Sequence, residues 1–253
     1  MTSSTDALAG TKGRRRIYLM RHGEVRYFDD QGKHVHPKFV DLTDDGRAQA
    51  AAMGELLADV PFDRAMSTGL PRTILTAQGV LAGQVLELGE IPELREIRSG
   101  SSKDKSPQQA RADFLNGFAN ADQPGAQFLG GDVFQEVYDR AVGALEAQLA
   151  APGWRNMLIV AHDGINCLLL GWASGAGLAA IAGFEQDPGC LNIIDVDMEA
   201  GEIQRRIIKL INLTPTNYSK LGNNLTSAEQ IFDYRRKVMA DLKAGLKANL
   251  KDS

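Results

Sequence analysis

The sequence predicts an α/β fold with a three-layer, doubly wound and mainly parallel sheet that carries helices on both faces. Short apolar runs, the clearest of which are residues 17–20 and 157–161, are typical of strands buried on both faces. Segments with apolar residues at helical spacing, such as residues 131–150, alternate with these runs. The chain has 253 residues, of which 43% are hydrophobic, so it is long enough to bury a full core.

The N-terminal elements begin after a polar stretch without periodicity, residues 1–13, which we expect to form a disordered arm. The first strand then ends at Arg21-His22-Gly23, where the glycine favours a turn. Thr43 is a good N-cap, and the two aspartates that follow it complement the helix dipole. We therefore predict a helix from this point to about residue 58.

The next strand-to-helix unit consists of a strand over residues 62–67 and a helix that begins at residues 70–73, with proline in its first turn. A third short strand is predicted over residues 85–88. From residue 99 to residue 127 the sequence becomes polar and rich in turn residues, although residues 108–118 also suit a helix. We expect this segment to form a cap over the sheet.

The C-terminal half contains a helix predicted from residue 131 to residue 150, and a strand over residues 157–161 that ends at His162-Asp163-Gly164. Another helix follows to about residue 172. Two apolar segments, residues 191–197 and 203–210, are joined by a short turn and predict a hairpin at the sheet edge.

The final segment, residues 214–253, is predicted to be a helical extension. Its last part carries apolar residues on one helical stripe, which is expected to dock on the domain or on a second subunit as a homodimer. The residues of this stripe are Ile231, Phe232, Val238, Met239, Leu242, Leu246 and Leu250.

Composition excludes several classes of protein. Asp and Glu outnumber Lys and Arg, and the resulting net charge of −4 argues against a nucleic-acid partner. No apolar stretch is long enough for a membrane span, and the first residues lack the core of a secretory signal, so we expect a cytoplasmic protein without a membrane partner. The two cysteines, Cys167 and Cys190, lie in apolar surroundings and are expected to be buried thiols.

Three strand-to-helix junctions bring basic side chains to one rim of the predicted sheet. They carry Arg21 and His22, Arg72, and His162. Guanidinium and imidazole groups that converge in this way form an anion pocket, and the bidentate geometry of arginine suits a phosphoryl group. A neutral imidazole is also a competent nucleophile at neutral pH. These residues therefore indicate phosphoryl-transfer chemistry.

The order and spacing of the motifs resemble those of the histidine phosphatase superfamily, which includes the cofactor-dependent phosphoglycerate mutases. The resemblance covers about residues 16–210, so we expect a histidine phosphatase domain over residues 14–213. The matching pieces are Leu19-Met20-Arg21-His22-Gly23-Glu24, Leu42-Thr43-x-x-Gly46-x-x-Gln49-Ala50, Ser67-x-x-Leu70-Pro71-Arg72-Thr73, Leu94-Arg95-Glu96, Gly130-Gly131-Asp132 and Val160-Ala161-His162-x-Gly164.

The resemblance implies a role for each site residue. It makes His22 the nucleophile that becomes phosphohistidine, and it places Arg21, Arg72 and His162 around the phosphoryl group, in a set to which we add Gly23 and Asp163. Glu96 is implied as the proton donor to the leaving oxygen and then as the base for the attacking water. Its carboxyl group must be protonated for the first step, which the reference pKa of about 4.3 disfavours unless burial raises it.

The sequence also departs from the family pattern. The family usually has threonine after R-H-G-E and an asparagine that helps to hold the phosphate, where this chain has Val25 and Phe28. Lys33, His34 or His36 are candidate substitutes for the missing donor. At position 163, aspartate replaces the common glycine or serine and brings negative charge close to an anion site.

We therefore expect a metal-independent phosphomonoesterase that acts on a small phosphorylated metabolite. No cofactor is expected, and no metal either, because His34 and His36 lack further ligands nearby. A phosphoglycerate mutase is the second hypothesis, which Ile97-Arg98-Ser99-Gly100 disfavours because the tyrosine-glycine continuation typical of mutases is absent. The third hypothesis is a catalytically weak member of the family that serves for binding or as a scaffold.

Overall fold

The computed structural model describes residues 13–27, 35–101, 104–231 and 233. Most of the expected arm over residues 1–13, the positions of Phe28, Lys33 and His34, and residues 234–253 with most of the apolar stripe of the extension lie outside this part of the chain. No helix within the described part is long and apolar enough to cross a membrane.

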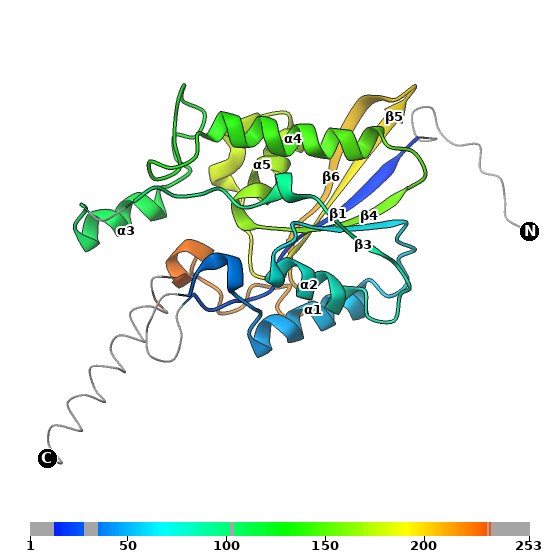
Figure 1. The fold of residues 1–253 in the computed structure, drawn as a ribbon, viewed down its shortest axis with the longest axis horizontal. Helices are drawn as coiled ribbons and strands as arrows, with labels where there is room; N and C mark the ends of the chain where they lie inside the picture. Colours follow the sequence, from blue (N-terminus) through cyan, green and yellow to red (C-terminus); the bar gives the residue numbers. More distant parts are fainter. Residues whose placement is uncertain (1–12, 28–34, 102–103, 232, 234–253) are drawn as a thin grey trace, which may run out of the picture.

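The fold is the predicted α/β architecture, built on one six-stranded sheet in the order β3-β2-β4-β1-β5-β6 (Figure 1). The strands are β1 (Arg15–Arg21), β2 (Arg64–Ser67), β3 (Leu88–Glu90), β4 (Asn156–Ala161), β5 (Leu191–Glu199) and β6 (Glu202–Leu213). The helices are η1 (Pro37–Phe39), α1 (Asp44–Leu56), α2 (Pro71–Val80), η2 (Pro92–Leu94), α3 (Pro107–Leu115), α4 (Phe134–Ala150), α5 (Asp163–Ser174) and η3 (Gly177–Gly183).

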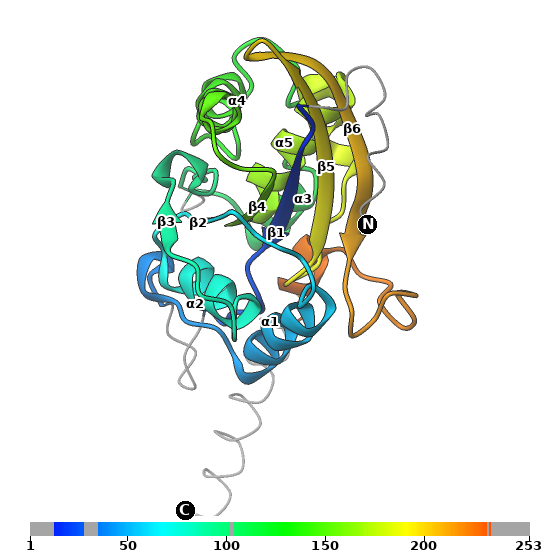
Figure 2. The same ribbon diagram turned by 90° about the vertical axis from the view of Figure 1, so that its right-hand side faces the viewer.

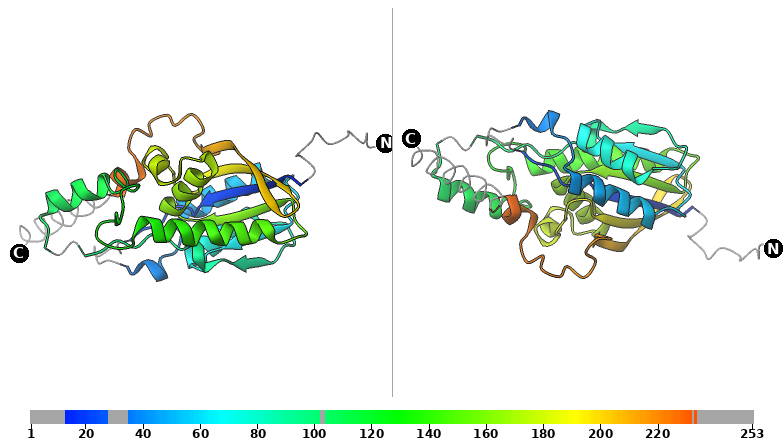
Figure 3. Two further views of the ribbon diagram at one scale, coloured as in Figure 1. Left: turned by 90° about the horizontal axis from the view of Figure 1, so that it is seen from above. Right: turned by 90° about the horizontal axis from the view of Figure 1, so that it is seen from below.

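The sheet is mainly parallel. β3, β2, β4 and β1 pair in parallel, whereas β5 and β6 are antiparallel and form the predicted edge hairpin. Figure 2 shows this order from β3 to β6 across the sheet. The two views in Figure 3 show α4 and α5 over one face, and α1 and α2 over the other. Helices on both faces make the three layers that the sequence predicts.

The central strands bury both of their faces, which explains their continuous apolar runs. Successive side chains of a strand point to opposite faces. Accordingly, Ile17 and Leu19 of β1 join a core with α4 and α5, whereas Tyr18 and Met20 join a second core with α1 and α2. Apolar burial on both faces therefore holds β1 and β4 at the centre of the sheet.

The local signals at helix starts are confirmed at two positions. Thr43 caps α1, and its Oγ1 accepts a hydrogen bond from Gly46 N at 3.0 Å. Pro71 occupies the first turn of α2. The third strand is different, because β3 spans Leu88–Glu90 rather than residues 85–88. Its register follows β2, whose Ala65 pairs with Leu88, and Val85 is left fully exposed.

The segment from residue 99 to residue 127 lies beyond the end of the sheet at which β1 and β4 finish. Figure 1 shows this position for α3. α3 ends at Leu115 and buries no residue. The only buried apolar side chain of the described part of the segment is Ala121. α3 thus stands beyond the rim of the sheet, whereas Ala121 belongs to the core under α4 and α5, and Phe118 and Ala126 pack against that core.

Two glycines allow the turn after β1 to approach α1 closely. A Cβ atom on Gly23 would lie 2.5 Å from the Gly46 carbonyl oxygen, and one on Gly46 would overlap the Glu24 carbonyl oxygen. We expect Gly46→Ala to lower the free energy of unfolding by about 1–3 kcal/mol, because backbone atoms cannot yield as a flexible side chain would. Urea denaturation followed by circular dichroism measures this change.

Gly143 is the matched control, because it lies on the exposed side of α4 and a Cβ there meets no atom within 4 Å. Gly143→Ala should raise the free energy of unfolding by about 0.5–1 kcal/mol, since alanine is the better helix residue. Equal effects of the two substitutions would contradict the close approach as the cause.

Candidate active site

Two histidines are neighbours because the strands that precede them are paired. β1 and β4 run in parallel with Arg21 opposite Ala161, and His22 N donates to Ala161 O at 3.1 Å. His22 and His162 follow directly, and their ring centroids lie 5.4 Å apart. Both residues are buried. The two junctions that carry these histidines therefore meet in one buried cluster.

The ring of His22 has a defined proton position. Its Nδ1 lies 2.8 Å from the Gly23 carbonyl oxygen, which only accepts hydrogen bonds, so Nδ1 carries the proton. Burial lowers the pKa of His22 well below its ordinary value, and the positive charges of Arg72 and Arg21 lower it further. His22 is therefore a neutral imidazole with the lone pair of Nε2 free to react.

The ring of His162 is fixed by a chain of hydrogen bonds. Arg72 Nη2 lies 3.3 Å from Nδ1 of His162 and can only donate, so Nδ1 accepts and Nε2 carries the proton. Nε2 then donates to Thr68 Oγ1 at 3.0 Å, and the Thr68 hydroxyl donates to Thr73 Oγ1 at 3.1 Å. The chain ends where the Thr73 hydroxyl donates to the Leu70 carbonyl at 2.8 Å.

The two arginines are buried, and each retains an unused donor. Arg21 Nη1 donates to the carbonyl of Gln186 and to Ser227 Oγ, and Arg72 Nη1 donates to the Pro37 carbonyl at 2.6 Å. The Nε atoms of Arg21 and Arg72 are buried and have no hydrogen-bond partner among the described residues. A buried donor without a partner costs about 1–3 kcal/mol, so an anion that accepts from both would bind favourably.

Glu96 contributes a carboxyl group with an altered pKa. It stands after η2, and its Oε2 accepts from Gly164 N, at the start of α5, at 3.3 Å. Desolvation in the pocket disfavours the charged form, and the negative charge of Asp163 adds to this, so that the pKa of Glu96 rises to about 7. Glu96 does not pair with Arg95 or Arg98, which bind the Thr68 carbonyl and Asp132 respectively.

The remaining predicted site residues also lie in or beside this buried cluster. Asp163 is the first residue of α5, and its Oδ2 lies 3.5 Å from Arg21 Nη1. The N–H of Gly23 donates to Thr76 Oγ1 at 2.9 Å, so this amide is already occupied. The carbonyl of Gly23 orients His22, as described above. The structure thus shows Asp163 as a partner of Arg21, and Gly23 as a support for His22.

The residues at the departures from the family pattern take other roles. Val25 forms an isolated bridge with Leu42. His36 Nδ1 accepts from Lys38 N at 3.1 Å and caps η1, so the side chain of His36 is used locally. Instead, the Pro37 carbonyl in the same turn contacts Arg72. Among the described residues, no group of three or more His, Cys, Asp or Glu side chains could hold a metal ion.

Sequence reasoning missed Thr68, Thr73 and the Pro37 carbonyl as parts of the site. The two threonines lie within the Ser67–Thr73 motif, close in sequence to Arg72. Hydroxyl side chains beside an arginine expected in the site were a signal that could have identified them. A main-chain carbonyl such as that of Pro37 leaves no trace in the residue type.

Comparisons with known proteins identify the family and the fold. A family model described as "Histidine phosphatase superfamily (branch 1)" matches residues 17–209. The adenosylcobalamin/alpha-ribazole phosphatase of Salmonella typhimurium is 28% identical over 72% of this chain and 90% of its own length. A probable phosphoglycerate mutase of Salmonella paratyphi A is 29% identical over 60% of this chain and 72% of its own length.

Among solved structures, a putative alpha-ribazole-5'-P phosphatase from Escherichia coli superposes with a TM-score of 0.63 and is 27% identical, covering 78% of this chain and 96% of that chain. The family model, which matches residues 17–209, spans every site residue that the sequence analysis named.

The pKa of Glu96 provides a test of the pocket's electrostatics. Replacing Asp163 with Asn removes a negative charge, so we expect the pKa of Glu96 to fall from about 7 towards the ordinary value for glutamate. Carbon-13 NMR titration of the Glu96 carboxyl group, assigned through Glu96→Gln, measures the change. As a control, Asp132→Asn alters a carboxylate that pairs with Arg98 at the surface and should leave the pKa unchanged. A Glu96 carboxyl group that titrates near pH 4 in the unsubstituted protein would contradict its desolvation and its interaction with Asp163.

Proposed function

The chain belongs to the histidine phosphatase superfamily, and we propose that it is a metal-independent phosphomonoester hydrolase that acts on a small phosphorylated metabolite through a phosphohistidine at His22. The observation that carries this proposal is the pair of buried, unpartnered Nε donors of Arg21 and Arg72 beside a neutral histidine whose Nε2 lone pair is free. An anionic, tetrahedral group with several acceptor oxygens satisfies these donors, and its phosphorus atom is the electrophile that the histidine requires.

In the first step, Nε2 of His22 attacks phosphorus and the bond from phosphorus to the ester oxygen breaks. The leaving oxygen takes a proton from the Glu96 carboxyl group, so that a neutral alcohol departs. A pKa of about 7 leaves a large share of Glu96 protonated at neutral pH, which an ordinary glutamate would not provide. The guanidinium groups of Arg21 and Arg72 stabilise the charge on the equatorial oxygens.

In the second step, water attacks the phosphohistidine while the Glu96 carboxylate, now unprotonated, accepts a proton from that water. The bond from phosphorus to Nε2 breaks, inorganic phosphate leaves, and His22 returns to its neutral form. Glu96 thereby alternates between acid and base within one turnover. Two guanidinium groups supply positive charge at the phosphoryl oxygens, and this supports a mechanism without a metal ion.

His162 is proposed to respond to the bound phosphoryl group. In the structure its pKa is held well below the ordinary value by burial and by the positive charges of Arg72 and Arg21. A dianion placed among these groups reverses the local field and favours the protonated ring. Nδ1 of His162 then becomes a donor to a phosphoryl oxygen and gives up the hydrogen bond that it accepts from Arg72 Nη2, while Thr68 continues to hold Nε2.

The similarity to phosphatases whose names specify alpha-ribazole phosphate supports a phosphomonoester of a small organic alcohol as the substrate class. The similarity to a probable phosphoglycerate mutase favours phosphoryl transfer between hydroxyl groups as the second candidate. The two activities share the phosphohistidine and differ in whether water or an alcohol accepts the phosphoryl group. A catalytically weak binding protein is the third outcome that an assay must separate.

The proposal is tested with a panel of an aryl phosphate and phosphorylated metabolites in the presence of EDTA, for the protein and for its His22→Ala variant. We expect hydrolysis by the unsubstituted protein, none above background by the variant, and acid-labile phosphate on His22 after rapid quenching. Hydrolysis by His22→Ala at the same rate would exclude the phosphohistidine. Isomerisation that depends on a bisphosphorylated primer would favour the mutase. A protein that binds phosphate but turns over nothing would be the scaffold.

Replacing Arg72 tests the arginine of the second junction. We expect Arg72→Ala to lower kcat/KM by about 10²–10⁴, because one of two guanidinium groups at the transferring phosphoryl group is lost. Arg64→Ala is the matched control, since Arg64 begins β2 at the opposite end of the same strand-to-helix unit and binds the Pro152 carbonyl. Its kcat/KM should stay within about twofold. A loss smaller than tenfold for Arg72→Ala would place Arg72 outside the reacting centre.

A further inference from the structure

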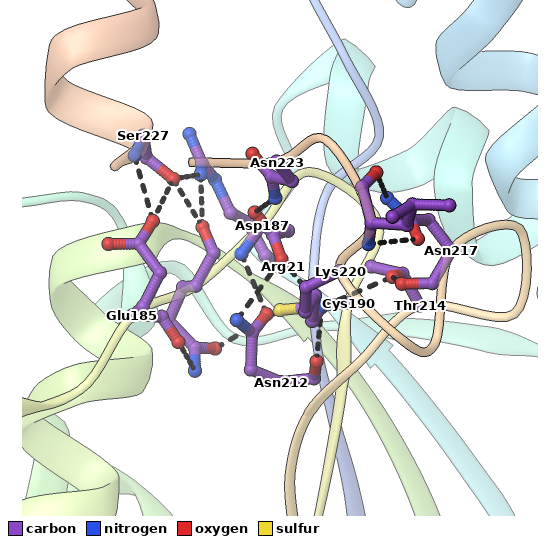
Figure 4. A network of polar contacts seen from close by, with 12 residues as sticks. Arg21, Glu185, Asp187, Cys190, Asn212, Thr214, Asn217, Lys220, Asn223 and Ser227 are labelled. Carbon is purple, nitrogen blue, oxygen red and sulfur yellow. Dashed lines mark hydrogen bonds and ion pairs between the residues drawn. The ribbon is translucent and has the colours of Figure 1, made fainter. Parts of the chain in front are cut away.

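The chain continues past the family match, which ends at residue 209, and a later segment returns to the pocket. We call residues 214–231 the returning segment. It leaves β6, passes around Asp187 and begins a helix at Ser227. Lys220 Nζ lies 2.6 Å from Asp187 Oδ2, and Asn223 Nδ2 donates to Asp187 Oδ1 at 2.8 Å. Figure 4 shows this network around Asp187.

The returning segment reaches Arg21 through one side chain. Arg21 Nη1 donates to Ser227 Oγ at 2.7 Å, and Ser227 is 5% exposed. Both Ser227 N and Ser227 Oγ lie within hydrogen-bond distance of Glu185 Oε1, at 2.8 and 2.7 Å. Figure 4 shows the serine hydroxyl next to both the guanidinium and the carboxylate. The arginine of the first junction is thus held by a residue outside the matched family domain.

The direction of these bonds follows from their donors. An arginine only donates, so Ser227 Oγ accepts from Arg21, and the serine has a single hydroxyl hydrogen left to give. Its acceptors are Glu185 Oε1 and the Gln186 carbonyl, at 2.7 and 2.6 Å. The carboxylate is the stronger acceptor because it is charged. A directional chain therefore leads from Arg21 through Ser227 to Glu185.

The partner residues of this chain are themselves fixed. The Gln186 carbonyl accepts from Arg21 Nη1 as well, and the side-chain amide of Gln186 is buried, with its Oε1 accepting from Asn192 Nδ2 at 2.7 Å. Asn192 Nδ2 also donates to the Leu19 carbonyl of β1 at 3.1 Å. One nitrogen of the guanidinium is consequently anchored to rigid elements, while Nε of Arg21 stays unpartnered within the described residues.

We propose that Ser227 is a positioning residue for Arg21 and that the returning segment completes the phosphate pocket. This inference rests on the proposed function, because it assumes that Arg21 binds the transferred phosphoryl group. An arginine side chain that is already fixed loses less conformational entropy when it binds its ligand. Ser227 acts only through Arg21.

The test compares Ser227→Ala with Thr226→Ala. Thr226 and Glu229 cap the helix that begins at Ser227, because Thr226 Oγ1 accepts from Glu229 N at 3.2 Å and Thr226 N donates to Glu229 Oε2 at 2.8 Å, but Thr226 is exposed. Thr226→Ala disturbs the helix start and leaves the contact with Arg21 in place, whereas Ser227→Ala removes that contact. We expect Ser227→Ala to raise the Kd for inorganic phosphate and the KM for an aryl phosphate about tenfold, with kcat changed less. Thr226→Ala should stay within about twofold of the unsubstituted protein.

A double-mutant cycle separates positioning from a general structural effect. In an Arg21→Lys background, Ser227→Ala should change the phosphate Kd by less than about twofold, because the group through which it acts has gone. A tenfold loss in both backgrounds would overturn the proposal. So would equal effects of Ser227→Ala and Thr226→Ala in the Arg21 background.

NMR of the Arg21 Nε–H group keeps this test independent of turnover. The signal is assigned by its loss in Arg21→Lys, and we expect Ser227→Ala to shift it and to speed rotation of the guanidinium, whereas Thr226→Ala leaves it unchanged. If the unsubstituted protein neither binds nor hydrolyses phosphate esters, the proposed function fails, and this signal still reports whether Ser227 holds Arg21. An Arg21 signal identical in all three proteins would overturn the positioning role.

Discussion

The parallel pairing of β1 with β4 is the constraint on which the site depends. Because Arg21 lies opposite Ala161, the residues that follow, His22 and His162, leave the sheet side by side. A slip of one residue would move a side chain by about 3.3 Å along the strand and turn it to the other face. Both faces of these strands are packed into separate apolar cores, so such a slip would place each side chain of the shifted strand in the wrong core and disrupt the packing of both. The energy of the core thereby maintains the distance between two catalytic candidates.

The charges around this pair determine the protonation of each group. Positive guanidinium groups and burial keep both histidines neutral, whereas burial and Asp163 keep a large share of Glu96 protonated at neutral pH. In water both kinds of group would be in the opposite state over much of the range between pH 4 and 6. Desolvation disfavours every charged form, and the sign of the neighbouring charges then decides which groups are shifted furthest.

The sequence predicted those features that local pattern or burial determines. The buried strands β1 and β4, the Thr43 cap and the junction residues were predicted because each has a local signal in composition or turn chemistry. The bounds of β3 were wrong because the strand pairs according to the register of β2, and Val85 has no partner in that register. The contact of Ser227 with Arg21 joins residues 206 positions apart. It arises from the path of the chain around Asp187, which no local pattern describes.

The way in which the arginines are held explains how the pocket can be both stable and receptive. Each guanidinium is anchored at terminal nitrogen atoms: Arg21 through Nη1 by Ser227 and Gln186, and Arg72 through Nη1 by Pro37 and through Nη2 by His162. Each leaves a buried Nε without a partner in the described part of the chain, at a cost of about 1–3 kcal/mol for such a donor. These unpartnered donors destabilise the free protein, and an anion that accepts hydrogen bonds from them removes the destabilisation. Binding therefore stabilises the folded chain as it fills the pocket, and anchoring at the terminal nitrogens keeps the unpartnered donors in place until the anion arrives.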